Sequence, residues 1–171
     1  MHEDGKPAAH GGPTVVLVGQ PNVGKSVIFG RLTGKYAVVS NYPGTSVEVT
    51  TGHLRIGEKT FTVIDTPGIN SLHPHSDDER VTRDILLERQ PDVIVQVADA
   101  KNLSRALSLT SQLLECGRPL VLCLNMSDEA EQAGVHIDTR ELSRLLGIEV
   151  IPTVAPEGEG LAALKRALLS P

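Results

Sequence analysis

The sequence predicts an α/β fold with a doubly wound, mostly parallel six-stranded sheet and one antiparallel edge strand. Short, almost continuously apolar runs recur along the chain, which is typical of strands that are buried on both faces. Segments whose apolar residues have helical spacing follow most of these runs, and this alternation favours parallel strands joined by helices. One pair of candidate strands is separated only by Gly57-Glu58, a hairpin signal that predicts antiparallel pairing.

In the first half of the chain, a strand over residues 14–19 and a helix over residues 24–33 are predicted. A polar loop over residues 35–46 leads to the two hairpin strands, at residues 47–56 and 60–64. The later elements are, in order, a helix over 78–88, a strand over 93–98, a helix over 103–115, a strand over 120–124, a helix over 139–146, a strand over 149–154 and a helix over 161–169.

The length of 171 residues corresponds to about one domain, at roughly 150 residues per domain. Residues 1–13 are polar and without periodicity, so we expect a mobile tail there and a single domain over residues 14–171. The net charge of −5 disfavours a nucleic acid as the main partner. No apolar run approaches the ~20 residues that cross a bilayer, which excludes a membrane-spanning chain but not the soluble domain of a membrane protein.

Two cysteines are predicted to be structural thiols. Cys116 falls at the end of a predicted helix and Cys123 in a predicted buried strand, and no signal-peptide pattern opens the chain. This cysteine usage is typical of the reduced cytoplasm.

The segment from Gly19 to Ser26 matches the phosphate-binding pattern G-x-x-x-x-G-K-[ST] and stands between a predicted strand and a predicted helix. Glycines allow successive backbone N–H groups and a helix N-terminus to face the phosphates closely. Lys25 is expected to reach the β- and γ-phosphates, and the Ser26 hydroxyl to bind Mg²⁺. The expected nucleotide contacts here are Gly19, Gln20, Pro21, Asn22, Val23, Gly24, Lys25, Ser26 and Val27.

A second motif, Asp65-Thr-Pro-Gly68, follows a predicted apolar strand. An Asp at the carboxyl end of such a strand can hold the magnesium ion through water, and the N–H of Gly68 can contact the γ-phosphate.

A third motif predicts the choice of base. Asn125-Met126-Ser-Asp128 follows another buried strand, and a carboxylate there can accept hydrogen bonds from the N1–H and 2-amino groups that guanine has and adenine lacks. Near the last strand, Val154 and Ala155 are expected to offer a backbone N–H to the guanine oxygen. The motifs together select GTP over ATP.

With these motifs in order, the chain resembles a Ras-like, translation-factor-class P-loop GTPase domain. Three details make it similar to the ferrous iron transport protein B family: the loop over residues 41–48, the stretch over residues 65–72, and Asn125-Met126 in place of the usual Asn-Lys. Residues 134–138 and 145–147 also resemble that family's sequence beyond the base-recognition motif.

The resemblance implies a cytoplasmic G domain at the inner membrane of a bacterium, which in this family precedes a small helical domain and a large membrane domain. GTP or GDP and those two domains are the implied partners, and GTP hydrolysis coupled to Fe²⁺ uptake is the implied activity. Whether the chain is a fragment and whether it forms a homo-oligomer stay open.

The resemblance also implies the catalytic groups of the first switch. Ser46 stands where the family usually has the Thr that senses the γ-phosphate and ligates Mg²⁺, so Thr45 and Ser46 are expected at the nucleotide. Val27 replaces a second hydroxyl residue after the Lys. Asn22 matches the family residue that ligates a K⁺ ion between the β- and γ-phosphates.

Hydrolysis is expected to be slow and stimulated by K⁺. The residue after Gly68, where Ras-type enzymes keep a water-orienting Gln, is the apolar Ile69, which cannot position a nucleophile. A bound monovalent cation would neutralise developing charge much as an arginine finger does. Lys25, Asn22, Gly68 and Ser46 are therefore the expected catalytic residues.

Two other function classes stay open. A ribosome- or tRNA-associated GTPase shares the Asn-x-Gly-Lys loop, but that class typically has Thr-Thr-Arg-Asp where this chain has Thr45-Ser-Val-Glu48. A non-enzymatic module that binds GTP and barely hydrolyses it is the third hypothesis. His73 and His75 are interpreted as part of a solvated loop rather than an iron site, and Arg80 as a solvated charge rather than an arginine finger.

Overall fold

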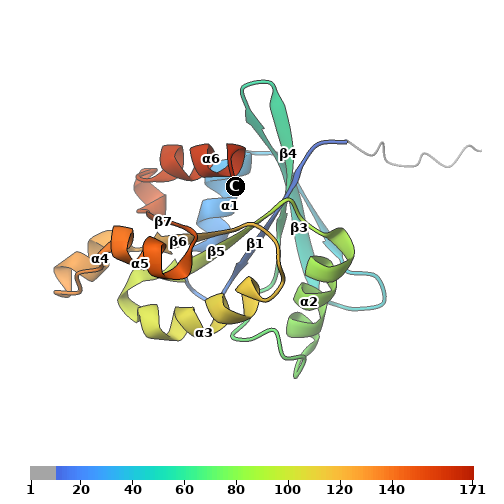
Figure 1. Cartoon of the computed structure of the whole chain (residues 1–171). Coiled ribbons are helices and arrows are strands. Elements are labelled where there is room, and N and C mark those ends of the chain that lie inside the picture. The colour runs from blue at the N-terminus through green and yellow to red at the C-terminus, as the bar shows by residue number, and fades with distance from the viewer. Residues whose placement is uncertain (1–10) are drawn as a thin grey trace, which may run out of the picture.

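A single sheet runs through the centre of the structure, a computed structural model that describes residues 11–171 (Figure 1). Its strand order is β2-β3-β4-β1-β5-β6-β7. The strands are β1 (Thr14–Gly19), β2 (Ala37–Asn41), β3 (Glu48–Ile56), β4 (Lys59–Asp65), β5 (Val93–Asp99), β6 (Leu120–Asn125) and β7 (Glu149–Pro152). All pairs from β4 to β7 are parallel, which confirms the predicted α/β fold with a mostly parallel sheet.

The sheet has seven strands rather than the predicted six, because β2 forms within the segment predicted as a loop. All five residues of β2 are exposed, so no alternation of buried and exposed positions marked it in the sequence. Pairing with β3, from Ala37↔Gly52 to Asn41↔Glu48, creates the strand. The antiparallel strand is therefore β3, one position in from the edge, and β2 is the edge.

Helices cover both faces of the sheet. In Figure 1, α1 and α6 lie on one side, and α2 and α3 lie on the other. The helical elements are α1 (Lys25–Thr33), α2 (Asp77–Arg89), η1 (Ala100–Asn102), α3 (Leu103–Leu114), α4 (Ser127–Gln132), α5 (Thr139–Leu146), η2 (Ala155–Glu157) and α6 (Leu161–Leu169).

The two faces of β1 show why the parallel strands are apolar throughout. Val15 and Leu17 pack in the core beneath α1 and α6, whereas Val16 and Val18 pack in the core beneath α2 and α3. Because successive side chains of a strand point to opposite faces, a strand covered on both sides needs an unbroken apolar run.

The short helix α4 was not predicted. It has six residues, mostly polar, and no apolar periodicity that would mark a helix. It begins after Met126, which has φ 58°, so the chain turns sharply between β6 and the helix. The predicted helices over residues 139–146 and 161–169 are confirmed to the residue.

The amino-terminal segment meets the sheet at β4. The predicted tail over residues 1–13 lies for the most part outside the described residues, but the carbonyl of Pro13 accepts a hydrogen bond from the N–H of Thr62 at 2.9 Å. No described helix is long and apolar enough to cross a membrane.

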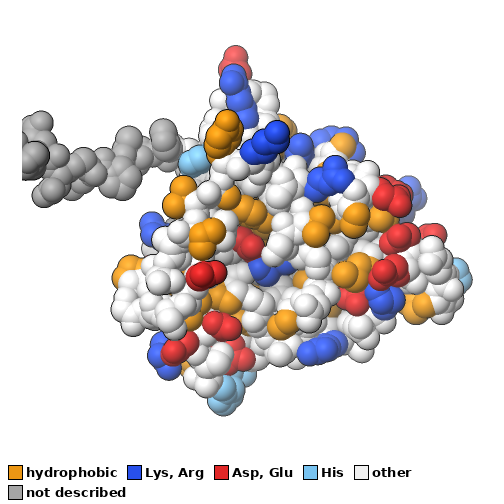
Figure 2. Space-filling view, turned by 180° about the vertical axis from the view of Figure 1, so that it is seen from behind, with side chains coloured by type: hydrophobic (Ala, Val, Ile, Leu, Met, Phe, Trp, Pro, Cys, Tyr) orange, Lys and Arg blue, Asp and Glu red, His pale blue; other side chains and the backbone are white. Residues whose placement is uncertain are grey.

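Charged side chains of both signs are interspersed over the face in Figure 2. The β3–β4 hairpin projects at the top of that view, with charged side chains at its tip.

Candidate nucleotide-binding site

A cleft of about 500 Å³ opens at the carboxyl end of β1, where the loop of residues 20–24 leads into α1. Its lining residues are Gln20, Pro21, Asn22, Gly24, Lys25, Ser26, Val27, Gly68 and Asp78. The strands on either side of β1 are β4 and β5, so the chain crosses from one half of the sheet to the other at this point. Ligands of open α/β sheets bind at such a topological switch point.

Backbone conformation shapes the phosphate-binding loop. Gly24 has φ 85°, and a Cβ there would lie 2.2 Å from the Asn125 Nδ2 atom, so only glycine fits. Asn22 has φ 63°, a left-handed conformation that Asn tolerates better than most residues. Asn22 is exposed at the rim of the cleft, and its side-chain amide is accessible to a ligand.

Lys25 is buried at the base of the cleft and is held by the second motif. Its ammonium group forms an ion pair with Asp65 and donates a hydrogen bond to the carbonyl of Thr66. Burial raises the pKa of Asp65 by more than the Lys25 charge and hydrogen bond lower it. The predicted proximity of the two motifs is therefore present in the structure.

Gly68 packs directly against the phosphate-binding loop. A Cβ at Gly68 would lie 3.0 Å from the Cα atom of Pro21, and the N–H of Ile69 donates to the carbonyl of Gly19 at 2.9 Å. The Ile69 side chain is 2% exposed and packs in the core beneath α2 and α3. Its side chain is thus directed away from the solvent in which a nucleophilic water would lie.

The side-chain amide of Asn125 joins three loops. It donates to the carbonyl of Val23 at 3.0 Å, and its oxygen accepts hydrogen bonds from the Thr153 hydroxyl and the Ala155 N–H, each at 3.1 Å. Asn125 is 2% exposed, so these bonds satisfy a buried amide. The β6 end, the phosphate-binding loop and the loop after β7 are thereby fixed together.

The base-recognition residues lie next to this junction. Asp128 is half-buried in the first turn of α4, and Ser127 donates from its hydroxyl to the Thr153 carbonyl at 3.0 Å. The two backbone N–H groups expected to meet guanine have partners within the chain. Val154 donates to Glu159 and Ala155 donates to Asn125.

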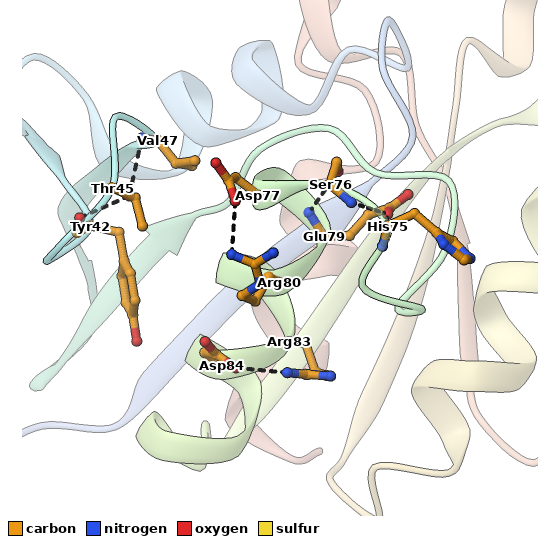
Figure 3. Close-up of polar contacts among 10 residues, drawn as sticks. All are labelled: Tyr42, Thr45, Val47, His75, Ser76, Asp77, Glu79, Arg80, Arg83 and Asp84. Carbon is orange, nitrogen blue, oxygen red and sulfur yellow. Dashed lines mark hydrogen bonds and ion pairs between the residues drawn. The ribbon is translucent and has the colours of Figure 1, made fainter.

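The first switch loop forms a tight turn between β2 and β3 (Figure 3). The N–H of Tyr42 donates to the carbonyl of Val47 at 2.8 Å, and the Thr45 hydroxyl donates to the Tyr42 carbonyl and accepts from the Val47 N–H. Ser46 is exposed. Neither Thr45 nor Ser46 is among the residues that line the cleft, so the structure does not bring these two predicted residues to the phosphate loop.

The loop over residues 66–76 between β4 and α2 is the second switch, and it ends at the start of α2. Ser76 and Glu79 form a reciprocal capping box, and Arg80 pairs with Asp77 at 2.9 Å on the side of α2 that faces the first switch (Figure 3). Arg80 is exposed and paired within its own helix. Within residues 11–171, no group of three or more His, Cys, Asp or Glu side chains is arranged to hold a metal ion.

Hydrogen bonds to α3 hold the middle of the second switch. Arg105 donates to the Asn70 side chain at 2.9 Å, and the Gln112 side chain accepts from the N–H of Leu72 at 2.7 Å. Gln20 of the phosphate-binding loop donates to the Arg105 carbonyl at 3.2 Å. One helix therefore contacts both loops that border the cleft.

Two charged residues near the site do not stand out as site residues in the sequence. Asp78 lines the cleft from the start of α2, and Lys101 contacts the base-recognition loop from η1. Neither belongs to a nucleotide-binding pattern, so only the packing of α2 and η1 reveals them.

Comparison with known proteins identifies the family. The family model described as ferrous iron transport protein B matches residues 13–168. The chain belongs to the ferrous iron transport protein B family. This confirms the resemblance found in the sequence, and the chain is thus a GTPase domain of that family.

The relatives place the chain within the family's architecture. The Fe(2+) transporter FeoB of Legionella pneumophila strain Paris is 42% identical over 158 residues, which are 90% of this chain and 21% of the relative. The solved G domain of T. maritima FeoB is 39% identical, with a TM-score of 0.86 over 92% of this chain and 96% of the other. The cytosolic domain of that protein in its GMPPNP form is also 39% identical, with a TM-score of 0.88 over 92% of this chain and 62% of the other. The chain thus spans about a fifth of the curated relative and nearly all of an isolated G domain.

Proposed function

We propose that this chain binds GTP and GDP in the cleft at the end of β1 and hydrolyses GTP slowly, as the nucleotide-dependent domain of a ferrous iron transporter. The observation that carries the proposal is the junction at Asn125, which fixes the phosphate-binding loop beside the helix turn that carries Asp128. A phosphate site and a guanine-selective carboxylate are thereby supported on one rigid edge of the sheet.

The oxygen donors around the cleft suit Mg²⁺. Ser26 lines the cleft from the first turn of α1, and Asp65, at the end of the neighbouring strand β4, forms an ion pair with Lys25, which also lines the cleft. Hard cations prefer such oxygen ligands. When bound, Mg²⁺ would neutralise charge on the β- and γ-phosphates. Lys25 would hold the phosphate oxygens and Gly68 would donate its N–H, with Ser46 joining after rearrangement of the first switch.

We assign the stimulating cation to Asn22. Its amide oxygen is a ligand for K⁺, and its exposure at the rim of the cleft supports this role. Burial of Ile69 leaves the position after Gly68 without a side chain that orients water, which supports a slow intrinsic rate.

The relatives support a proposal for the wider setting of the chain. The L. pneumophila protein is named Fe(2+) transporter FeoB and the T. maritima protein is named as the FeoB iron transporter, and this chain matches 158 residues of the first and the G domain of the second. We therefore place the chain at the cytoplasmic face of the bacterial inner membrane, where nucleotide binding and hydrolysis would be coupled to Fe²⁺ uptake through helical and membrane domains.

Binding and hydrolysis assays on the wild-type chain test the proposal. Fluorescent GTP and GDP should bind at least tenfold more tightly than the ATP analogue, because adenine lacks the donors that Asp128 accepts. Phosphate release should be measurable in KCl and slower in NaCl. Equal affinity for GTP and ATP would refute the role of Asp128 in base recognition. Phosphate release no faster than background in both salts would indicate a module that binds GTP without hydrolysing it.

A further inference from the structure

Lys101 connects the end of β5 to α4, the helix that carries Asp128. Its Nζ atom lies 3.1 Å from the Asp99 carboxylate, forms an ion pair with Glu129 of α4, and lies 3.5 Å from the Sδ atom of Met126. Its backbone N–H donates to Asp99 at 2.9 Å. Asp99 therefore contacts both the backbone N–H and the side-chain ammonium of Lys101. The ammonium group lies between the carboxylates of Asp99 and Glu129.

Met126 is the second residue of this contact between η1 and the turn into α4. It stands where the base-recognition motif usually carries Lys, and it is half-buried at the turn into α4. Its Cε atom would lie 3.9 Å from a Cβ atom at Gly24, so the side chain extends over the phosphate-binding loop. The chain thus has an apolar side chain at position 126, where a positively charged one is usual, and the Lys101 ammonium contacts that side chain.

We propose that Lys101 is a positioning residue for nucleotide binding and supplies, from η1, the positive charge that position 126 lacks. The inference deepens the proposed function and rests on it. Lys101 holds Glu129, the residue directly after Asp128, and so fixes the turn that carries the base-recognising carboxylate. It also balances Asp99 and Glu129, whose negative charges would otherwise oppose an anionic nucleotide beside Asp128.

The charged groups around Lys101 come from two elements besides its own. Asp99 belongs to β5, and Glu129 belongs to α4. Asn102 of η1 donates to the second oxygen of Asp99 at 3.3 Å. With Lys101 in place, one ammonium pairs with the carboxylates of Asp99 and Glu129, and without it this pair is wholly anionic.

The test measures dissociation of fluorescent GDP and GTP by stopped flow. We expect Lys101→Gln to release both nucleotides about two- to fivefold faster, since exposed ion pairs have effects of this size. Lys101→Arg should stay near the wild-type rate. The double variant Lys101→Gln/Met126→Lys should recover at least half of the loss, because the charge returns at the usual position.

Arg144→Gln is the matched control. Arg144 pairs with Glu141 on α5 in an exposed ion pair that touches no predicted nucleotide contact, so its loss should leave the release rates unchanged. Wild-type release rates in Lys101→Gln, or a double variant as fast as Lys101→Gln, would overturn the proposal. Failure of the proposed function is separate, because it would appear in the wild-type chain as equal affinity for GTP and ATP.

Discussion

The amide of Asn125 and the carbonyl of Val23 are joined by a buried hydrogen bond of 3.0 Å across 102 residues of sequence. Through this bond, the loop that is expected to hold phosphates and the loop that is expected to hold the base are built as one unit.

Asn125→Asp should destabilise the fold. The substitution keeps the shape of the side chain but replaces the donor that faces Val23 with a carboxylate oxygen, leaving two acceptors opposed in a buried site. We expect a loss of about 1–3 kcal/mol in the free energy of unfolding, measured by urea denaturation. Asn41→Asp, at an exposed end of β2, is the control and should change stability little. A variant as stable as wild type would show that this bond contributes nothing to the junction.

Lys25→Ala should weaken GTP binding by about ten- to hundredfold, the loss expected from one charge-assisted contact of ~1.5–3 kcal/mol. The substitution has a second effect, because Lys25 also holds Asp65 and Thr66. Isothermal titration with GTP measures the first effect. Wild-type affinity in the variant would show that Lys25 does not contribute to the nucleotide-binding site.

The second effect of Lys25→Ala depends on pH. Burial already raises the pKa of Asp65, and loss of the Lys25 charge removes an influence that lowers it. A carboxyl with a raised folded-state pKa favours folding at low pH, and this contribution is lost as pH rises through the folded pKa. The melting temperature of the variant should therefore fall furthest below wild type at neutral pH, and the difference should shrink as pH falls toward the ordinary Asp pKa of 3.8. Adding Asp65→Asn should remove this trend.

Asp128→Asn should change the preferred base from guanine to xanthine. The amide of Asn can donate to the 2-oxo group of xanthine, which replaces the 2-amino group that the carboxylate is expected to contact. Competition of XTP and GTP against a fluorescent nucleotide measures the preference. A variant that still favours GTP over XTP would contradict the role of Asp128.

Asn22→Ala should abolish stimulation by K⁺ with little loss of nucleotide affinity. In the wild-type chain, GTP turnover should be at least several-fold faster in KCl than in NaCl at equal ionic strength, because the ion adds positive charge where negative charge develops. The comparison is made with steady-state phosphate release. A variant that keeps the K⁺ response would show that the cation does not bind at this loop.

The thiols should differ in reactivity. Burial raises the pKa of Cys123 to about 12 in β6, whereas Cys116 is half-buried after α3 and its pKa is raised by burial to a smaller extent. Iodoacetamide at pH 8 should therefore alkylate Cys116 slowly and leave Cys123 unmodified, as read by mass spectrometry. Both should react in guanidinium chloride, and rapid labelling of Cys123 in the folded chain would contradict its burial.

The sequence predicts most of this fold because its signals are local. A glycine-rich loop between an apolar strand and a helix is readable from consecutive residues, and so are helices such as α5 and α6. Strand β2 was missed because its residues are all exposed, without an alternation of buried and exposed positions, and acquire their conformation by pairing with β3.

Prediction of the site is limited by the same physics. Asp65, Gly68 and Asn125 adjoin the phosphate loop as expected because parallel strands end at one edge of a sheet. The positions of Thr45 and Ser46 depend instead on how a loop folds on itself, through the hydrogen bonds around Tyr42. Such contacts have no counterpart in a pattern of residue types.

The paired strands β2, β3 and β4 form a ribbon that connects the two switch loops. The first switch leaves this ribbon at Asn41 and Glu48, and the second leaves it after Asp65, which pairs with Thr50 at the same end. Val49 packs toward α2 and Leu54 toward α1, so a slip of one residue in β3 would pull both from their cores at once. The packing of β3 into both cores therefore opposes sliding of these strands, and their register keeps the ends of the two switch loops together.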